Sequence, residues 1–389
     1  MVRLFVTTSH LCTLYMLSYA RNTNKGNYTD VLILDTPPKK KSLKKAITDT
    51  QKIYQWDSII DLSTTLDDNA DFEPNTRKSL TRKLKGKPII KPVYDFLLKI
   101  YLKQQQNKEV KIIQNKLLNK GNIIEVNLLT QTIVNATLFK LFPKANVNYF
   151  EHGQGDYFFI QNIKSNNFYF YCVFADSFRK YLQSKKQENT YVKNLPDINN
   201  FSSLANEVIE FNRNEAGIDN QLNIEGKLVL ILMESVQIYN VPDAFWTDYL
   251  DLCLSQISNL NEYTFILKPH PLQSVKSLEI SKKHLLKTRK LKVLVIENNE
   301  AVNYSVEVLY SIWKDNTQYV FSLFSSASYY ISKLYGNEKT TFYYAYDFFK
   351  KYMDNAPKQF VAIYDGINDV VKNVLTENCI DISRSNYRL

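Results

Sequence analysis

Short apolar runs alternate with helical patterns along the chain, and this alternation predicts an α/β protein. In the first half, continuous apolar runs typical of buried parallel strands occur at residues 2–6, 30–35, 58–62, 123–126 and 147–150. Segments with helical periodicity occur at residues 11–19, 42–54, 77–116 and 130–141. Strands and helices in this order are typical of a doubly wound sheet.

The same alternation starts again in the second half of the chain. Residues 176–225 are rich in Asn, Gln, Lys and Asp, and we expect them to be an irregular connection. Strands are then predicted at residues 228–232, 264–267, 293–296, 319–323 and 341–344, and helices at residues 244–260, 278–288, 305–314, 327–334 and 367–375. We therefore expect two Rossmann-like, doubly wound domains, 1–222 and 223–375, followed by a C-terminal tail, 376–389. Ligands of such domains bind where the strands end.

Length and composition agree with this picture and exclude several classes of protein. The 389 residues suit two domains of ordinary size. The four cysteines include no CxxC pair and no ligand spacing to histidine, so a zinc site and a disulfide framework are not expected. Residues 4–20 are too polar for a signal peptide or a membrane anchor. We expect a cytoplasmic protein whose membrane contacts, if it makes any, are peripheral.

The chain is basic, and this favours an anionic partner. Its 49 Lys and Arg residues exceed its 39 Asp and Glu residues by 10. The basic residues gather in clusters that include Lys39 and Lys40, Arg77 and Lys83, and residues 282–292. Nucleic acid, anionic lipid and acidic polysaccharide all fit this charge. The sequence carries no nucleic-acid-binding signature, so nucleic acid is the least favoured of the three.

Three polar motifs follow predicted strands, where the ligand-binding edge of a parallel sheet would lie. The first contains Glu151, His152 and Gly153, and a carboxylate beside glycine at a strand end suits a general base. The second is residues 268–271, Lys-Pro-His-Pro, in which the prolines hold His270 in a fixed backbone.

The third motif, residues 322–328, contains Ser325 and Ser326 at the start of a predicted helix. Serine hydroxyls and the backbone N–H groups of a helix N-terminus form a site for anions. For each motif an ordinary turn or helix cap is the alternative interpretation.

The three motifs in this order resemble the bacterial sialyltransferases of GT-B architecture, most closely the capsular polysialyltransferases and the related lipooligosaccharide sialyltransferases. The resemblance implies that Glu151 is the catalytic base and that His270 assists the departing phosphate. It also implies that Ser325 and Ser326 donate hydrogen bonds to that phosphate. The family has an acidic pair where this chain has Glu151-His152, so His152 and Asp156 remain alternatives for the base.

The resemblance implies an activity and a division of labour between the domains. The N-terminal domain would bind the acceptor and the C-terminal domain the cytidine monophosphate (CMP) part of CMP-sialic acid. The reaction would be a single inverting displacement in which sialic acid passes to a glycan, most plausibly a growing polysialic acid capsule chain. No acidic metal-binding motif is seen, so we expect neither a metal nor a cofactor. Further substrate contacts are predicted for Lys268, Pro271, Gly153, Glu297, Glu300 and Ser235.

The basic clusters can then be interpreted in two ways, and the sequence does not distinguish between them. Lys39, Lys40, Arg77 and Lys83 could bind an anionic glycan acceptor, or could hold the protein against anionic lipid or capsule-assembly proteins at the inner face of the bacterial inner membrane. Four alternatives to a polysialyltransferase also stay open. They are a lipooligosaccharide α-2,3-sialyltransferase, another GT-B transferase with a CMP- or CDP-linked donor, a non-catalytic capsule scaffold and, as the most remote, a nucleic-acid-binding protein.

Overall fold

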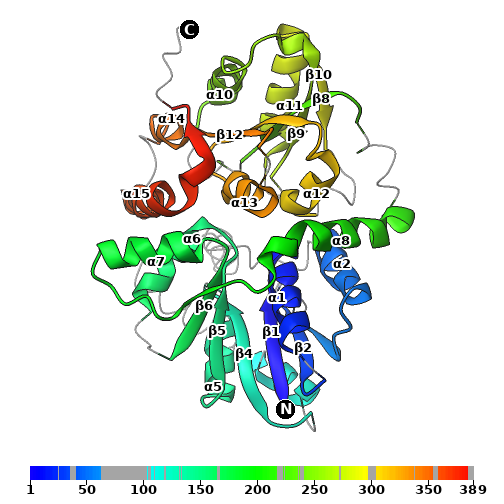
Figure 1. The fold of residues 1–389 in the computed structure, drawn as a ribbon, viewed down its shortest axis with the longest axis vertical. Helices are drawn as coiled ribbons and strands as arrows, with labels where there is room; N and C mark the ends of the chain where they lie inside the picture. Colours follow the sequence, from blue (N-terminus) through cyan, green and yellow to red (C-terminus); the bar gives the residue numbers. More distant parts are fainter. Residues whose placement is uncertain are drawn as a thin grey trace, which may run out of the picture. The chain divides into compact units, whose positions relative to one another are not determined.

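The protein contains two β-sheets with helices between their strands (Figure 1). The structure is a computed structural model. It describes residues 1–24, 26–35, 41–62, 103, 107–108, 110–117, 120–130, 132, 134–163, 167–216, 222, 224–234, 236, 241–270, 273–296, 304–336, 338–353 and 358–383. The contacts divide the chain into two compact units. The first is Met1–His152 with Lys164–Tyr171, and the second is Gly153–Ile163 with Cys172–Leu389.

The first sheet has the strand order β3-β2-β1-β4-β5-β6-β7. Its strands are β1 (Val2–Thr7), β2 (Thr29–Leu34), β3 (Ser58–Asp61), β4 (Ile123–Leu129), β5 (Asn146–Phe150), β6 (Phe168–Cys172) and β7 (Val192–Asn194). The helices that connect them in the first unit are α1 (His10–Thr23), α2 (Lys41–Asp49) and α5 (Val134–Leu141). All six residues of β1 are buried, as expected for a central parallel strand with helices on both faces of its sheet.

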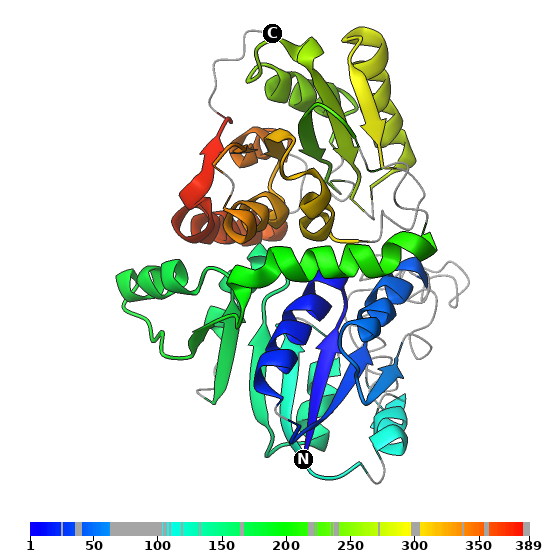
Figure 2. The ribbon, with the colours of Figure 1, turned by 45° about the vertical axis from the view of Figure 1, so that its right-hand side comes forward.

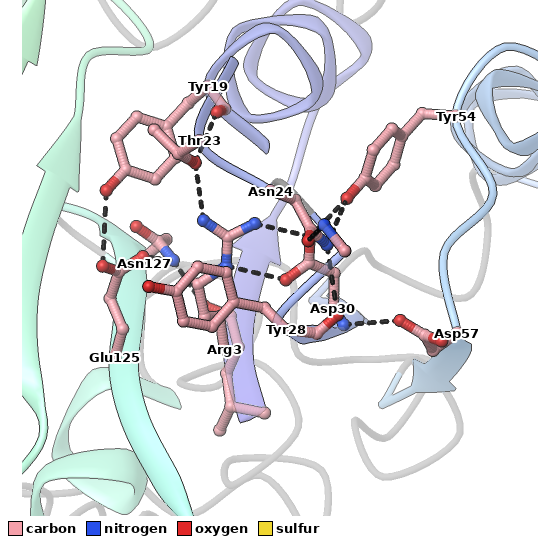
Figure 3. A network of polar contacts seen from close by, with 12 residues as sticks. Arg3, Tyr19, Thr23, Asn24, Tyr28, Asp30, Tyr54, Asp57, Glu125 and Asn127 are labelled. Atoms are coloured by element: carbon pink, nitrogen blue, oxygen red, sulfur yellow. Dashed lines mark hydrogen bonds and ion pairs between the residues drawn. The ribbon is translucent and has the colours of Figure 1, made fainter. Parts of the chain in front are cut away.

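A buried ionic network lies at the amino ends of β1, β2 and β4 (Figure 3). The Arg3 guanidinium donates to both carboxylate oxygens of Asp30, at 2.7 Å from Nε and 2.6 Å from Nη2. Its Nη1 donates to the Thr23 hydroxyl, and the Asn24 amide donates to Asp30 at 2.9 Å. Arg3 and Asp30 are at most 1% exposed. Because both charges are satisfied inside the protein, the network can be buried without a large energetic cost.

The second sheet has the order β10-β9-β8-β11-β12-β13, and every neighbouring pair in it is parallel. Its strands are β8 (Lys227–Leu232), β9 (Tyr263–Lys268), β10 (Lys292–Val295), β11 (Thr317–Ser322), β12 (Thr341–Tyr344) and β13 (Cys379–Asp381). The chain runs outward from β8 through β9 to β10 and then returns to β11 on the other side of β8. The order therefore reverses between β8 and β11, which is where ligands bind in open sheets of this kind.

Helices fill the connections of the second unit. They are α6 (Gln154–Phe159), α7 (Ala175–Ser184), α8 (Phe201–Ala216), α10 (Ala244–Leu254), α11 (Val275–Lys283), α12 (Val306–Trp313), α13 (Ser326–Tyr335), α14 (Tyr346–Lys350) and α15 (Lys358–Val370). The helices α10 and α11 contact each other, whereas α12 contacts α8 and α13, and α15 contacts α6. Figure 2 shows α8 as one continuous helix in bright green.

Two expectations about the connecting and terminal segments were wrong. Residues 176–225 are not an irregular connection, because α7, β7 and α8 lie within them. The buried residues of α8 include Phe201, Leu204, Ala205 and Val208, which have the helical i, i+3, i+4, i+7 spacing despite the polar composition around them. Residues 379–381, predicted to lie in a C-terminal tail, form β13 at the edge of the second sheet.

The other predicted strands are confirmed to within three residues of their ends. The domain boundary at 222 stays a prediction. It falls between β7 of the first sheet and β8 of the second, whereas the compact units divide the chain near residues 152 and 172. Most of the helix predicted at residues 77–116 lies outside the described residues. Across the described residues, no helix has the length and apolar character needed to cross a bilayer.

Candidate functional site

The second and third sequence motifs lie at one edge of the second sheet. β8 pairs with β9 on one side and with β11 on the other, so the carboxyl ends of the three strands are adjacent. Lys268 is the last residue of β9, and its carbonyl accepts a hydrogen bond from the Met233 N–H, just after β8, at 2.9 Å. His270 follows two residues later and is partly exposed. The edge therefore brings the residues after β8, the Lys-Pro-His motif and the serine motif together.

The serines of the third motif have different local roles. Ser325 is the N-cap of α13, and its hydroxyl accepts from the Ala327 N–H at 3.3 Å. The Ser328 hydroxyl is fully buried and bonds to the Ser322 hydroxyl at 2.7 Å, so it joins α13 to β11. Ser326 is the first residue of α13 and is partly exposed. Among the described residues, its hydroxyl neither caps the helix nor bonds to another serine. Its hydroxyl and the N–H groups of the first turn of α13 are suited to bind an anion.

The first motif begins at the end of β5. Glu151 is fully buried, and its N–H donates to the Tyr171 carbonyl at 3.2 Å. His152 is exposed. Asp156 is 1% exposed, and its carboxylate accepts from the Gly153 N–H at 3.0 Å, which closes the first turn of α6. Asp156 is therefore a helix-capping residue.

The second half of the first motif contacts the third motif within the second unit. Gln154, the first residue of α6, donates from Nε2 to the Phe324 carbonyl at 2.6 Å. A Cβ atom placed on Gly153 would lie 3.8 Å from Ser326 Oγ, so the absence of a side chain at Gly153 leaves space beside that hydroxyl. Gln154 stands inside the motif, but its role was not predicted, because nothing in the sequence indicates which carbonyl a glutamine side chain will reach.

Three buried titratable groups surround this edge of the sheet. Burial raises the pKa of Glu234 to about 8, although backbone N–H groups of Ser325 and Phe324 act in the opposite direction. Burial lowers the pKa of Lys268 to about 8, opposed by the charge of Glu307 on α12. Burial also raises the pKa of Glu307 to about 7, against hydrogen bonds from its own N–H and Ser305 and the charge of Lys268. Shifted pKa values in one place are typical of functional sites.

Several predicted substrate contacts lie outside the described residues. They are Ser235, Pro271, Glu297 and Glu300 in the second half of the chain, and Lys39, Lys40, Arg77 and Lys83 in the first half. Within the residues that are described, no group of three or more His, Cys, Asp or Glu side chains could hold a metal ion.

At the end of β1, the polar residues belong to the local structure of the first unit. Ser9 is the N-cap of α1, and its hydroxyl accepts from the Cys12 N–H at 3.3 Å. The Thr7 hydroxyl bonds to Thr13 at 2.9 Å, and burial lowers the pKa of His10 to about 3, so that its imidazole is neutral. These contacts position α1 against β1.

The chain matches no protein-family model and no curated protein sequence. Several solved structures are similar to it over nearly its whole length. One is UDP-GlcNAc 2-epimerase from Neisseria meningitidis bound to UDP-GlcNAc, with TM-score 0.55 and 12% identity, covering 96% of this chain and 91% of that one. Another is UDP-GlcNAc 2-epimerase from Methanocaldococcus jannaschii in complex with UDP-GlcNAc and UDP, with TM-score 0.53 and 13% identity, covering 97% and 93%.

At this level of identity the likeness concerns the fold. The predicted fold class is confirmed: the chain has the GT-B type of architecture, with two Rossmann-like domains, each built on a parallel sheet.

Proposed function

We propose that the protein is an inverting sialyltransferase that moves sialic acid from CMP-sialic acid to a glycan, and that the glycan is a growing polysialic acid chain of a bacterial capsule. The observation that carries the proposal is the convergence of motif residues in the second unit. Gln154 contacts Phe324, Gly153 lies beside Ser326, and Lys268 ends the strand two places from β11. A binding site for the donor phosphate needs such a meeting of hydroxyl, N–H and cationic groups.

The use of a sugar nucleotide in general has a second support. Two of the similar solved structures are described as bound to UDP-GlcNAc, and their fold covers more than 95% of this chain. The choice of CMP-sialic acid rests instead on the three motifs and on their resemblance to the bacterial sialyltransferases.

In the proposed mechanism, the Glu151 carboxylate removes the proton of the acceptor hydroxyl as its oxygen attacks the anomeric carbon of sialic acid. The bond from that carbon to the phosphate oxygen breaks, and CMP leaves with the bonding electrons. The attack comes from the face opposite the leaving group, so the configuration inverts. His270, Ser325, Ser326 and the N–H groups at the start of α13 stabilise the charge that develops on the phosphate. We expect these groups to carry the reaction without a metal, which the use of EDTA in the assay tests.

The basic residues of the chain support an anionic acceptor. Polysialic acid carries one carboxylate per sugar, and a chain with a net charge of +10 attracts such a polymer. We assign this role to the clusters that contain Lys39, Lys40, Arg77 and Lys83. The same residues are the ones that would hold the protein at an anionic membrane surface.

The proposal is tested by donor and acceptor choice. CMP-sialic acid and UDP-GlcNAc are offered separately in EDTA, with a sialic acid oligomer or a lactose-ended glycan as acceptor. Extension of the oligomer from CMP-sialic acid is the expected result. Transfer to lactose alone would favour the lipooligosaccharide sialyltransferases, and epimerisation of UDP-GlcNAc without any use of CMP-sialic acid would overturn the proposal.

A further inference from the structure

Glu234 is a buried carboxyl group beside the segment that leads into α13. It follows β8 by two residues, between the ends of β9 and β11, and is 5% exposed. Its carboxyl group interacts with the backbone N–H groups of Phe324 and Ser325. Within the described part of the chain, its Oε1 atom is completely buried and has no hydrogen-bond partner. A buried polar atom without a hydrogen-bond partner destabilises the folded state, so its presence in a native structure needs an explanation.

Glu234 and Gln154 hold the same short segment between β11 and α13 through different atoms. The Phe324 carbonyl accepts from Gln154 at 2.6 Å, while the N–H groups of Phe324 and Ser325 face the carboxyl group of Glu234. The segment leads directly into Ser326 and the first turn of α13. Its two anchors therefore determine where the hydroxyl of Ser326 and the free N–H groups of that turn point.

The charge of Glu234 decides how well this place receives an anion. A carboxylate close to the start of α13 would repel a phosphate, and the repulsion is strong where water is excluded. Burial raises the pKa of Glu234 to about 8, so the group is mostly protonated and neutral at pH 7. Above pH 8 it becomes a carboxylate. The second pKa of a phosphate monoester is about 6, so a nucleoside monophosphate is mostly doubly charged at pH 7 and its own ionisation adds little to this change.

Other titratable groups pack around Glu234 and must be considered with it. Tyr249 on α10 and Tyr329 on α13 both face it, and burial raises the pKa of each well above the usual tyrosine value, so both stay neutral. Cys253 faces Tyr249, and burial raises the pKa of its thiol as well. Lys268 ends the neighbouring strand and loses its proton near pH 8, the same range as Glu234. Glu307 faces Lys268 and ionises near pH 7.

We propose that Glu234 is a positioning residue for a nucleotide phosphate at the start of α13, and that the phosphate binds tightly only when Glu234 carries its proton. This inference deepens the proposed function and rests on it in taking the ligand to be a nucleotide. Binding then draws a proton onto Glu234. If the bound phosphate raises the pKa of Glu234 by one unit, the affinity above both pKa values is about tenfold lower than the affinity below both. Each further unit adds another factor of about ten.

The test compares the wild type with Glu234→Gln, in which the amide oxygen can still accept from the two N–H groups and no charge can form. Dissociation constants for CMP, UDP and inorganic phosphate are measured between pH 7 and pH 9. Glu262→Gln is the matched control, because Glu262 is a carboxylate of the same unit that precedes the opposite end of β9 and pairs with Lys227 on the protein surface. Thermal unfolding of all three proteins checks that each is folded.

The wild type and Glu262→Gln should bind the nucleotide about tenfold more weakly at pH 9 than at pH 7, and Glu234→Gln should lose most of this difference while binding normally at pH 7. If Glu234→Gln weakens with pH as the wild type does, Lys268 is the cause and the inference is wrong. A pH profile that is flat in the wild type also overturns it. Binding of UDP in preference to CMP, with the predicted profile, would instead contradict the sialyltransferase proposal alone. Failure to bind any of the three compounds contradicts both.

Discussion

Ionisable side chains are buried at two edges of the described sheets, and the two groups differ in their hydrogen-bond partners. At the amino edge of the first sheet, Arg3 and Asp30 meet through two hydrogen bonds, at 2.7 and 2.6 Å, and polar neighbours complete the network (Figure 3). At the carboxyl edge of the second sheet, Glu234 is equally buried, but one of its carboxyl oxygens has no partner among the described residues. In the first arrangement each charge has a partner of opposite sign. In the second, burial favours the neutral form of the carboxyl group.

On this difference we propose that the first edge is structural and that the second is the functional edge. A buried ion pair keeps both charges over the physiological pH range and serves to fix two strands relative to each other. Groups such as Glu234, Lys268 and Glu307, whose pKa values lie between about 7 and about 8, can gain or lose a proton when a ligand arrives. The functional edge is also where the strand order reverses.

The largest expected effect comes from breaking the structural pair. Arg3→Met leaves the Asp30 carboxylate buried without its partner, and we expect the free energy of unfolding to fall by about 3–5 kcal/mol. Lys276→Met is the control, because Lys276 pairs with Asp243 at the protein surface and such pairs contribute only about 0–1 kcal/mol. Denaturant unfolding at pH 7 measures both. Equal stabilities of the two variants would remove the distinction between the edges.

The next effect concerns stability at the functional edge as a function of pH. The folded protein holds a proton on Glu234 up to about pH 8, whereas an unfolded glutamic acid releases it near pH 4.5. Wild-type stability is therefore lost as pH rises through this range, by up to about 1.4 kcal/mol per pH unit. Glu234→Gln lacks this loss, so it should become more stable relative to the wild type between pH 5 and pH 8. Parallel curves in denaturant unfolding would show that Glu234 is ionised throughout.

Two neighbouring serines should differ in their effect on stability. Ser325→Ala removes the N-cap of α13 as well as a proposed phosphate donor, so it should cost about 1 kcal/mol of stability and also weaken nucleotide binding. Ser326→Ala removes no cap, so its stability should be unchanged while nucleotide affinity falls roughly tenfold through loss of a hydrogen bond to a charged phosphate. Thermal unfolding and nucleotide titration of both variants measure the two effects. If Ser326→Ala binds normally, the hydroxyl of Ser326 does not contact the phosphate.

The smallest effect is expected from Gln154→Ala, which releases the Phe324 carbonyl. Loss of one neutral hydrogen bond is worth roughly 1 kcal/mol, so nucleotide affinity should fall about fivefold. Gln161→Ala is the matched control, because Gln161 also donates its amide to a carbonyl at 2.6 Å, that of Tyr157, in the turn directly after α6. An equal loss of affinity in both variants would mean that α6 as a whole matters rather than the contact with Phe324.

Much of the fold could be predicted from the sequence, because buried parallel strands are continuous apolar runs such as residues 228–232. The helix α8 was missed because polar residues such as Asn206 and Glu207 dominate its composition and hide the spacing of Phe201, Leu204 and Val208. The edge strand β13 has only three residues, too few for a pattern.

The meeting of the second and third motifs could be predicted in outline, since each directly follows a strand of the second sheet and the carboxyl ends of parallel strands lie at one edge of a sheet. The electrostatics of the candidate site could not. Nothing in the residues Met233-Glu234 shows that the carboxyl group is buried, and the pKa shift depends on the helices that cover it. The partner of Gln154 depends on a contact between segments 170 residues apart in the chain.

The most direct test of the central claim is the release of CMP from CMP-sialic acid in the presence of a sialic acid oligomer and EDTA, by the wild type and by Glu151→Gln and His270→Ala. We predict rapid release with lengthening of the oligomer by the wild type, and a loss of at least about a hundredfold in each variant, because each removes a group that acts in the transition state. Release that is undiminished in both variants, or no release by the wild type, would contradict the assignment of the three motifs to a sialyltransferase site.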